Sequence, residues 1–354
     1  MDAKNPTGLM GIEFVELASP EPTRLHELFL AFGFSRTMRH ATKAVDLYEQ
    51  NDIRFLLNRE PSSLAAKFST QHGPAISAMG WRFEDPALAA EAAKQRGATV
   101  TSTGDHATRS GPLDAIVGLG ESLLYLVNGA PESRERLYRD MGFVPLERPD
   151  LVKEKGFLAI DHLTNNVAQG TMQRWASFYK DVFGFTEVRY FDIRGAKTGL
   201  TSYALRSPDG SFCIPINEAT ESKSQIAEYL DEYKGPGVQH LAFLTKDILA
   251  SLAALEGTPI DFLDIDDDYY ANVFERVPGV SEDHGEIARR NVLVDGDAEG
   301  YLLQIFTKNL IGPIFIELIQ RKNHLSFGEG NFGALFRSIE RDQARRGVFD
   351  EERA

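Results

Sequence analysis

The sequence has little of three things: cysteine, positive charge and long apolar runs. A single cysteine, Cys213, in 354 residues cannot form an intramolecular disulfide, and its apolar setting is typical of a buried thiol. No segment approaches the roughly 20 apolar residues that a membrane helix needs. The net charge of −14 argues against nucleic-acid or anionic-membrane partners, which require clustered basic residues. With its polar N-terminus, the chain is expected to be a cytoplasmic enzyme or small-molecule-binding protein.

What the sequence does contain is an internal repeat at domain length. Residues 11–17 and 157–163 are similar openings, and each leads to a Phe-Gly-Phe sequence 21 or 26 residues further on. Two further openings, residues 76–83 and 238–243, each precede an alanine-containing helical stretch. Counting all four openings, the sequence predicts an α+β protein built from four βαβββ modules that pair into two domains.

The domain boundary is expected near residue 150. Residues 146–155 are polar and contain proline between two apolar openings, which is typical of a linker. This divides the chain into domains at 1–150 and 151–354. Near the C-terminus, residues 332–347 form a predicted amphipathic helix, whose apolar residues at i, i+3, i+4 and i+7 must cover a core or a cavity.

Three polar residues in apolar strands of the second half suggest a metal site. A lone buried histidine such as His162 is more often a satisfied core residue than a ligand. Glu317, however, lies in an otherwise apolar strand, where burying its charge unpaired would cost several kcal/mol. The intervals from His162 to His240 and from His240 to Glu317 are 78 and 77 residues, so the three occupy similar points in successive modules. Two imidazoles and a carboxylate are typical of a non-haem Fe(II) centre, and catalytic zinc with the same ligands stays open.

The first half provides a contrast. Phe14 stands where His162 does, Ala78 aligns with His240, and Tyr125 aligns roughly with Glu317. The first half is therefore expected to be a metal-free scaffold. The other histidines lie in predicted loops or helix faces and are expected to have surface roles: His26, His40, His72, His106, His284 and His324.

Several ordered segments of the second half resemble the signature sequences of 4-hydroxyphenylpyruvate dioxygenase. The resemblance extends from about residue 158 to residue 339, whereas the first half is similar only at the level of the repeated module. The segments that carry it are residues 215–218, 223–226, 237–242, 302–308, 315–321 and 327–332.

The resemblance implies the vicinal-oxygen-chelate fold, in which each domain is a curled, open β-barrel with outer helices. It implies Fe(II) bound by His162, His240 and Glu317, and conversion of 4-hydroxyphenylpyruvate and O2 to homogentisate and CO2 in tyrosine and phenylalanine catabolism. A 2-oxo acid can chelate iron through its carboxylate and keto oxygens, so no separate oxo acid is needed. Bacterial members of the family suggest a homo-oligomer.

The resemblance also assigns roles to glutamines and an aromatic residue near the iron. Gln304 and Gln239 match positions taken as catalytic, and Gln304 and Phe306 match pocket-lining positions. Alternation along a strand places Gln304 and Phe306 on one face. Gln239 neighbours His240 and is expected to point to the opposite face unless a β-bulge intervenes.

Other matched positions would contact the substrate. Ser202, Asn217 and Gln225 match residues that face the phenol end of the substrate in this family. Phe327 and Phe332 match aromatic residues that meet its ring from the C-terminal segment, which makes the helix over 332–347 a candidate lid that excludes water.

Three alternative functions remain open. 4-Hydroxymandelate synthase shares fold, ligands and substrate with the dioxygenase but gives a different product. An extradiol catechol dioxygenase also uses two histidines and a glutamate on duplicated modules. A non-catalytic binding protein of the same fold would need a cavity but no intact triad.

Two further patterns are interpreted as decoys. Residues 264–268 are unusually acidic and imitate a calcium loop, but Tyr269 occupies the place that needs glycine, so a solvated loop is expected. The glycines of residues 328–333 fit a dinucleotide fingerprint but lie too near the C-terminus to begin a βαβ unit.

Overall fold

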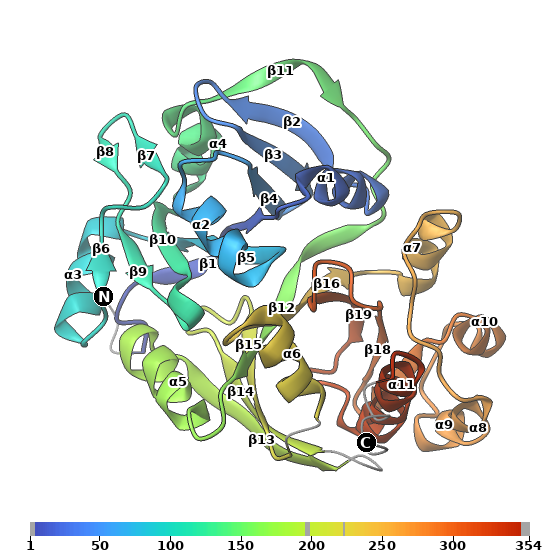
Figure 1. The fold of residues 1–354 in the computed structure, drawn as a ribbon. Helices are drawn as coiled ribbons and strands as arrows, with labels where there is room; N and C mark the ends of the chain where they lie inside the picture. The colour runs from blue at the N-terminus through green and yellow to red at the C-terminus, as the bar shows by residue number, and fades with distance from the viewer. Residues whose placement is uncertain (1–3, 195–198, 222–223, 348–354) are drawn as a thin grey trace.

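The computed structural model describes residues 4–194, 199–221 and 224–347, which form two large curled β-sheets flanked by helices (Figure 1). One sheet comes from each half of the chain. The first half contains β1 (Leu9–Ala18), α1 (Pro22–Ala31), β2 (Ser35–His40), β3 (Val45–Gln50), β4 (Ile53–Asn58), α2 (Leu64–His72), β5 (Ala75–Phe83), α3 (Pro86–Gln95), β6 (Val100–Thr101), β7 (Ala107–Thr108), β8 (Gly111–Pro112), β9 (Ala115–Val117), η1 (Leu119–Glu121), β10 (Leu123–Asn128), α4 (Pro131–Asp140) and β11 (Phe143–Asp150).

The second half repeats this order as far as the helix that follows its second opening strand. It contains β12 (Phe157–Val167), α5 (Met172–Phe178), η2 (Tyr179–Phe183), β13 (Thr186–Arg194), β14 (Gly199–Arg206), β15 (Cys213–Ala219), α6 (Gln225–Tyr233), β16 (Gly237–Thr245), α7 (Ile248–Leu255), α8 (Asp267–Tyr270), α9 (Val273–Arg276), α10 (His284–Arg289), β17 (Leu293–Gly296), β18 (Tyr301–Phe306), β19 (Phe315–Lys322), η3 (Glu329–Asn331) and α11 (Phe332–Arg345).

The strand order reproduces the four predicted βαβββ modules. The nine-stranded sheet runs β11-β2-β3-β4-β1-β5-β10-β9-β6, and the eight-stranded sheet runs β13-β14-β15-β12-β16-β19-β18-β17. In each sheet the opening strands of two modules, β1 with β5 and β12 with β16, pair antiparallel at the centre. The α+β fold predicted from the repeats is confirmed.

The helix after the second opening strand begins in the same way in both halves. The Asp85 side chain accepts hydrogen bonds from the first turn of α3, and the Asp247 side chain accepts one from Ala250 in the first turn of α7. Such N-caps satisfy backbone N–H groups that have no partner inside the helix. Equivalent caps therefore start equivalent helices next to the two central strand pairs.

Strand register in the first half brings five of its residues close together. Phe14 of β1 lies opposite Gly80 of β5, and Glu16 lies opposite Ala78. On the other side of β5, Gly80 lies beside Tyr125 of β10. A Cβ atom at Gly80 would lie 2.3 Å from the Phe14 ring, so glycine makes room for that aromatic side chain.

The register of the second half is the same. His162 of β12 lies opposite Ala242 of β16, Thr164 lies opposite His240, and Ala242 lies beside Glu317 of β19. At the register positions of the three candidate ligands, the first half has Phe14, Ala78 and Tyr125. The alignment inferred from sequence spacing is therefore correct to the residue.

A continuous apolar core joins the two halves. The Phe243 ring of β16 lies 5.9 Å from Phe32 and 5.7 Å from Phe34, measured between ring centroids. Trp81 of β5 meets Phe183 and Phe212 at 5.0 and 5.4 Å. Burial of these large rings removes apolar surface from water and holds the sheets together.

Two predicted boundaries need correction. The interval 146–155, expected as a linker, is divided: residues up to Asp150 belong to β11, which pairs with β2, and 151–156 make the connection. The C-terminal helix begins at Phe332 as predicted and ends at Arg345, two residues before the expected end. No helix in the described parts of the chain is long and apolar enough to cross a membrane.

Candidate active site

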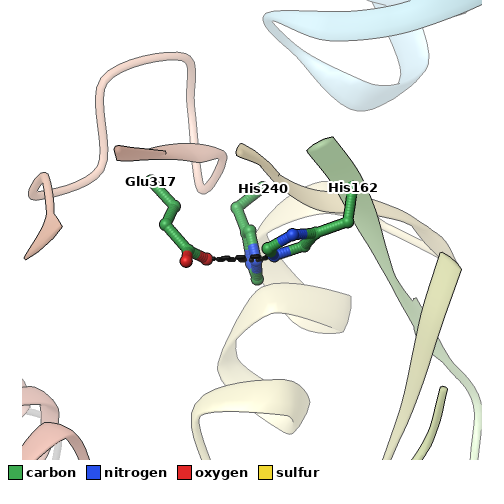
Figure 2. A group of neighbouring side chains, drawn as sticks. All are labelled: His162, His240 and Glu317. Carbon is green, nitrogen blue, oxygen red and sulfur yellow. Dashed lines mark hydrogen bonds and ion pairs between the residues drawn. The ribbon is translucent and has the colours of Figure 1, made fainter. Parts of the chain in front are cut away.

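His162, His240 and Glu317 converge from three adjacent strands (Figure 2). The Nε2 atoms of the two histidines lie 3.3 Å apart, and Glu317 Oε2 lies 3.0 Å from His162 Nε2 and 3.3 Å from His240 Nε2. All three residues are buried. Ligands bound at right angles with metal bonds of about 2.1 Å would be about 3.0 Å apart, so these separations suit one face of a metal ion.

Hydrogen bonds to the outer ring nitrogens orient both histidines. His162 Nδ1 donates to Asp161 Oδ2 at 2.7 Å, and His240 Nδ1 donates to Gln239 Oε1 at 3.0 Å. In the neutral rings, the Nε2 lone pairs then point at each other and at the Glu317 carboxylate. Three electron-rich atoms this close repel each other unless a cation lies between them, so the donor set fits a divalent metal.

The electrostatics of the cluster have the same sense. Burial by itself lowers the pKa of His162, but the carboxylates of Glu317 and Asp161 outweigh it and raise that pKa to about 9. Burial lowers the pKa of His240, only partly offset by Glu317. For Glu317, burial opposes ionisation, but the two histidines prevail and lower its pKa. The metal-free cluster therefore holds one proton on His162 at neutral pH, where a cation would take its place.

The predicted polar substrate contacts line one cavity with this cluster. Ser202 of β14 and Asn217 of β15 are directly paired across their strands, and both are buried. Gln225, the first residue of α6, and Gln239 line the same cavity. Asn217 Nδ2 lies 3.5 Å from Gln239 Oε1, which connects this polar group to His240.

The aromatic wall is formed largely by the C-terminal segment. The Phe327 ring meets the His162 ring edge to face, with 5.6 Å between centroids. Phe332 and Phe306 also line the cavity. The whole apolar stripe of α11 also faces it, namely Phe332, Leu335, Phe336 and Ile339.

The chain is similar to known proteins over nearly its whole length. Residues 3–148 match the N-terminal region of hydroxyphenylpyruvate dioxygenase, and residues 159–286 match the glyoxalase/bleomycin resistance protein/dioxygenase superfamily. The 4-hydroxyphenylpyruvate dioxygenase of Pseudomonas sp. strain P.J. 874 is 43% identical over 360 residues, covering 99% of each chain. The chain belongs to the 4-hydroxyphenylpyruvate dioxygenase family. Protein MelA of Shewanella colwelliana is 56% identical over 346 residues, covering 98% of this chain and 99% of MelA.

A solved structure of a 4-hydroxymandelate synthase variant from Streptomyces coelicolor shares the fold, with a TM-score of 0.82 over 95% of this chain and 99% of that one. At 23% identity the likeness concerns the fold alone. The vicinal-oxygen-chelate architecture expected from the resemblance is confirmed.

Gln239 faces the cavity because β16 contains a β-bulge. The register passes from Thr164 opposite His240 to Asn165 opposite Val238, which leaves Gln239 as the extra residue. A bulge turns the extra side chain out of the regular alternation. Gln239 therefore does not point to the face opposite His240, because the β-bulge that was named as the exception is present.

Gln304 is predicted to line the pocket, and the structure places it directly beneath Gly328. It lies on the same strand face as Phe306 but is completely buried, and it is not among the cavity-lining residues. Gly328 covers it so closely that a Cβ there would lie 2.5 Å from the Gln304 amide. Neither polar atom of this amide has a hydrogen-bond partner among the described residues.

Two side chains at the site were missed. The Phe315 ring stacks on the His240 ring with 4.8 Å between centroids, and the Thr164 hydroxyl lies 3.1 Å from His240 Nε2. A signal existed for both, because each is two residues from a candidate ligand and therefore shares its strand face.

Expectations outside the cluster also need correction. His72 and His106 are buried rather than on the surface, and His106 pairs with the buried carboxylate of Glu16. The acidic loop over 264–268 is more than a solvated loop, because Asp264 and Asp266 pair with arginines of α11. The arginines involved are Arg337, Arg341 and Arg345.

Proposed function

We propose that the chain is an Fe(II)-dependent dioxygenase that converts 4-hydroxyphenylpyruvate and O2 to homogentisate and CO2, a step of tyrosine and phenylalanine catabolism. One observation carries the proposal: two imidazole nitrogens and a carboxylate oxygen converge within 3.3 Å of one another at a cavity that also has an aromatic wall. Such a set leaves coordination positions for a chelating substrate and oxygen.

Each group of residues has a distinct task in this reaction. His162, His240 and Glu317 would hold the iron, which supplies the ability to activate O2 next to the bound 2-oxo acid. Asp161 and Gln239 hold the two imidazoles with Nε2 toward the ion.

The remaining cavity residues would bind and orient the substrate. The rings of Phe306, Phe327 and Phe332 are placed to hold the aromatic ring by apolar contact. The polar group at the phenol end would consist of Ser202, Asn217 and Gln225. The apolar stripe of α11 keeps water from the reacting centre. Gln304 would contribute only if its amide moved from beneath Gly328.

The experiment that tests this function is anaerobic Fe(II) loading, followed by 4-hydroxyphenylpyruvate and air, with oxygen uptake and product measured together. We expect one homogentisate for each O2 consumed. 4-Hydroxymandelate as the product would overturn the choice in favour of the synthase. Oxygen uptake with catechol but none with the oxo acid would favour an extradiol enzyme.

A non-catalytic binding protein would bind the oxo acid, contain almost no iron and consume no O2.

We also propose a cytoplasmic homo-oligomer, on the basis of the composition and of the family's bacterial members. Light scattering of the purified chain tests the oligomer, since a monomer would contradict it.

A further inference from the structure

Arg321 lies on β19, four residues beyond Glu317, with most of its side chain buried. Its Nε donates to Asp161 Oδ1 at 2.7 Å, and one terminal nitrogen donates to Asp161 Oδ2 at 2.8 Å. This two-pronged geometry is available to a guanidinium and not to an ammonium group. Asp161 is the same carboxylate that accepts from His162 Nδ1.

The other terminal nitrogen of Arg321 holds the segment that leads to the C-terminal helix. It donates to the carbonyl oxygen of His324 at 3.1 Å and to that of Ser326 at 2.6 Å. The guanidinium carbon also lies 5.9 Å from the centre of the Phe327 ring. One arginine thus fixes the backbone on both sides of Leu325 and touches the aromatic residue that follows Ser326.

These contacts form a closed network that begins and ends at His162. They run from His162 to Asp161, on to Arg321, then to the backbone before Phe327, and back through the Phe327 ring, which lies against His162. The orientation of the candidate metal ligand and the position of the aromatic wall are therefore joined twice, once by ring contact and once through the guanidinium.

We propose that Arg321 is a positioning residue that couples metal occupancy at His162 to the placement of the segment 324–331 and its aromatic wall. The proposal rests on the function proposed above for the site but concerns how the site is assembled. Coupling between two sites is reciprocal, so a metal ion that holds His162 also orders the segment, and an ordered segment tightens metal binding.

The decisive variant is Arg321→Lys, because it keeps a positive charge next to Asp161 but cannot hold the carboxylate and both carbonyl groups together. Arg276→Lys is the matched control. Arg276 binds Asp295 at 2.6 Å and Asn331 at 3.3 Å, so it anchors the same segment from the other side without a contact to a candidate ligand in the described structure.

The first measurement is anaerobic titration of the metal-free proteins with Co(II), followed by its absorption bands. Loss of an outer partner of a metal-bound histidine weakens metal binding by about 10- to 100-fold. Arg321→Lys keeps Asp161 as that partner but releases it from the two-pronged contact, so we expect a weakening at the lower end of this range, about tenfold. Arg276→Lys is expected to bind Co(II) like the wild type. Equal affinity for the wild type and Arg321→Lys would overturn the proposal.

The second measurement is amide hydrogen exchange over 324–331 with and without Co(II). In the wild type and in Arg276→Lys, metal loading should slow exchange in this segment, whereas in Arg321→Lys the metal should have no effect there. A metal response in Arg321→Lys equal to that of the wild type would contradict coupling through this residue.

Neither readout requires turnover, so failure of the proposed reaction and failure of the coupling are distinguishable. If Arg321→Lys does not fold, Asp161→Asn carries the same two predictions, because it removes the carboxylate between His162 and the guanidinium. Wild-type behaviour of that variant in both measurements would overturn the proposal equally.

Discussion

The two halves of the molecule use one scaffold for different purposes. Where the second sheet gathers two imidazoles and a carboxylate, the first places Phe14, Ala78 and Tyr125 at the same register positions. The rings of Phe14 and Tyr125 lie 6.3 Å apart, and Gly80 leaves space for Phe14. Strand register decides where three side chains meet, and their identities decide whether they suit an ion or an apolar core.

The first half nevertheless keeps a buried polar pair. The Glu16 carboxylate contacts His106 and accepts a hydrogen bond from Asn58 at 3.1 Å. Burial opposes ionisation of Glu16, but His106, together with hydrogen bonds from Asn58 and Ser77, outweighs it and lowers the pKa of this carboxyl. One imidazole and one carboxylate satisfy each other without an ion, whereas the second imidazole of the other half leaves lone pairs facing each other.

Even the β-bulge is shared between the halves. Ser77 of β5 is the extra residue in the first sheet, at the position that Gln239 occupies in the second. The Ser77 hydroxyl lies near the Glu16 carboxylate, at 3.4 Å, while Gln239 orients His240. The bulge is thus a property of the scaffold that each half uses for its own polar cluster.

The largest effect is expected from Glu317→Gln, which removes the negative ligand while keeping the size of the side chain. Turnover should fall to the detection limit, and the absorption bands of bound Co(II) should disappear, because two neutral imidazoles alone bind the ion weakly. Tyr125→Phe, the matched change at the equivalent position, should keep both. Full activity in Glu317→Gln would contradict the claim that Glu317 is a metal ligand and that Tyr125 is its metal-free counterpart.

Phe14→Ala is expected to act only on stability. Removal of a buried phenylalanine leaves a cavity and should lower the free energy of unfolding by about 3–5 kcal/mol, measured by denaturant titration. The metal content of the folded fraction should stay the same as in the wild type. A loss of metal from chains that remain folded would show that the first half takes part in the site.

Asn217→Ala should reduce recognition of the substrate hydroxyl. Loss of a hydrogen-bond partner in a buried site costs about 1–3 kcal/mol, which corresponds to roughly 5- to 150-fold in kcat/KM for 4-hydroxyphenylpyruvate. Phenylpyruvate, which lacks the hydroxyl, should be affected much less. Asn58→Ala, a buried asparagine of the first sheet, is the control and should leave the ratio of the two substrates unchanged; an equal loss for both substrates with Asn217→Ala would contradict the assigned contact.

Metal affinity should decrease as the pH is lowered, and this effect should be smaller than the effects of the substitutions above. The pKa of His162 is raised to about 9 in the metal-free cluster, so below pH 9 the ion must displace a proton. Co(II) binding should weaken by up to about tenfold for each pH unit from 9 toward 6.5, and titration calorimetry in different buffers should detect the released proton. The folding stability of the metal-free protein should change in the opposite direction. The stabilisation that comes from the raised pKa of His162 is complete below about pH 6.5 and is lost as the pH rises through 9. Affinity that is constant over this range would contradict the shared-proton state.

Sequence patterns were sufficient for the repeat, the module order and the convergence of His162, His240 and Glu317, because equal spacing reflects equal register. The apolar stripe of α11 was also predictable, since helical periodicity needs no tertiary information. The position of Gln304 was not, because alternation gives the strand face but not the depth along the strand or the cover from Gly328. The burial of His106 depends on Glu16, a partner 90 residues away that only the fold brings near.

The assignment of the reaction to the second half is tested most directly by the iron content and turnover of wild type and His162→Ala after identical anaerobic Fe(II) loading. We predict one iron per chain and conversion of 4-hydroxyphenylpyruvate for the wild type. We predict neither for the variant, whose first half is intact. Two irons per wild-type chain, or an iron and turnover retained by His162→Ala, would contradict the assignment of the reaction to the second half.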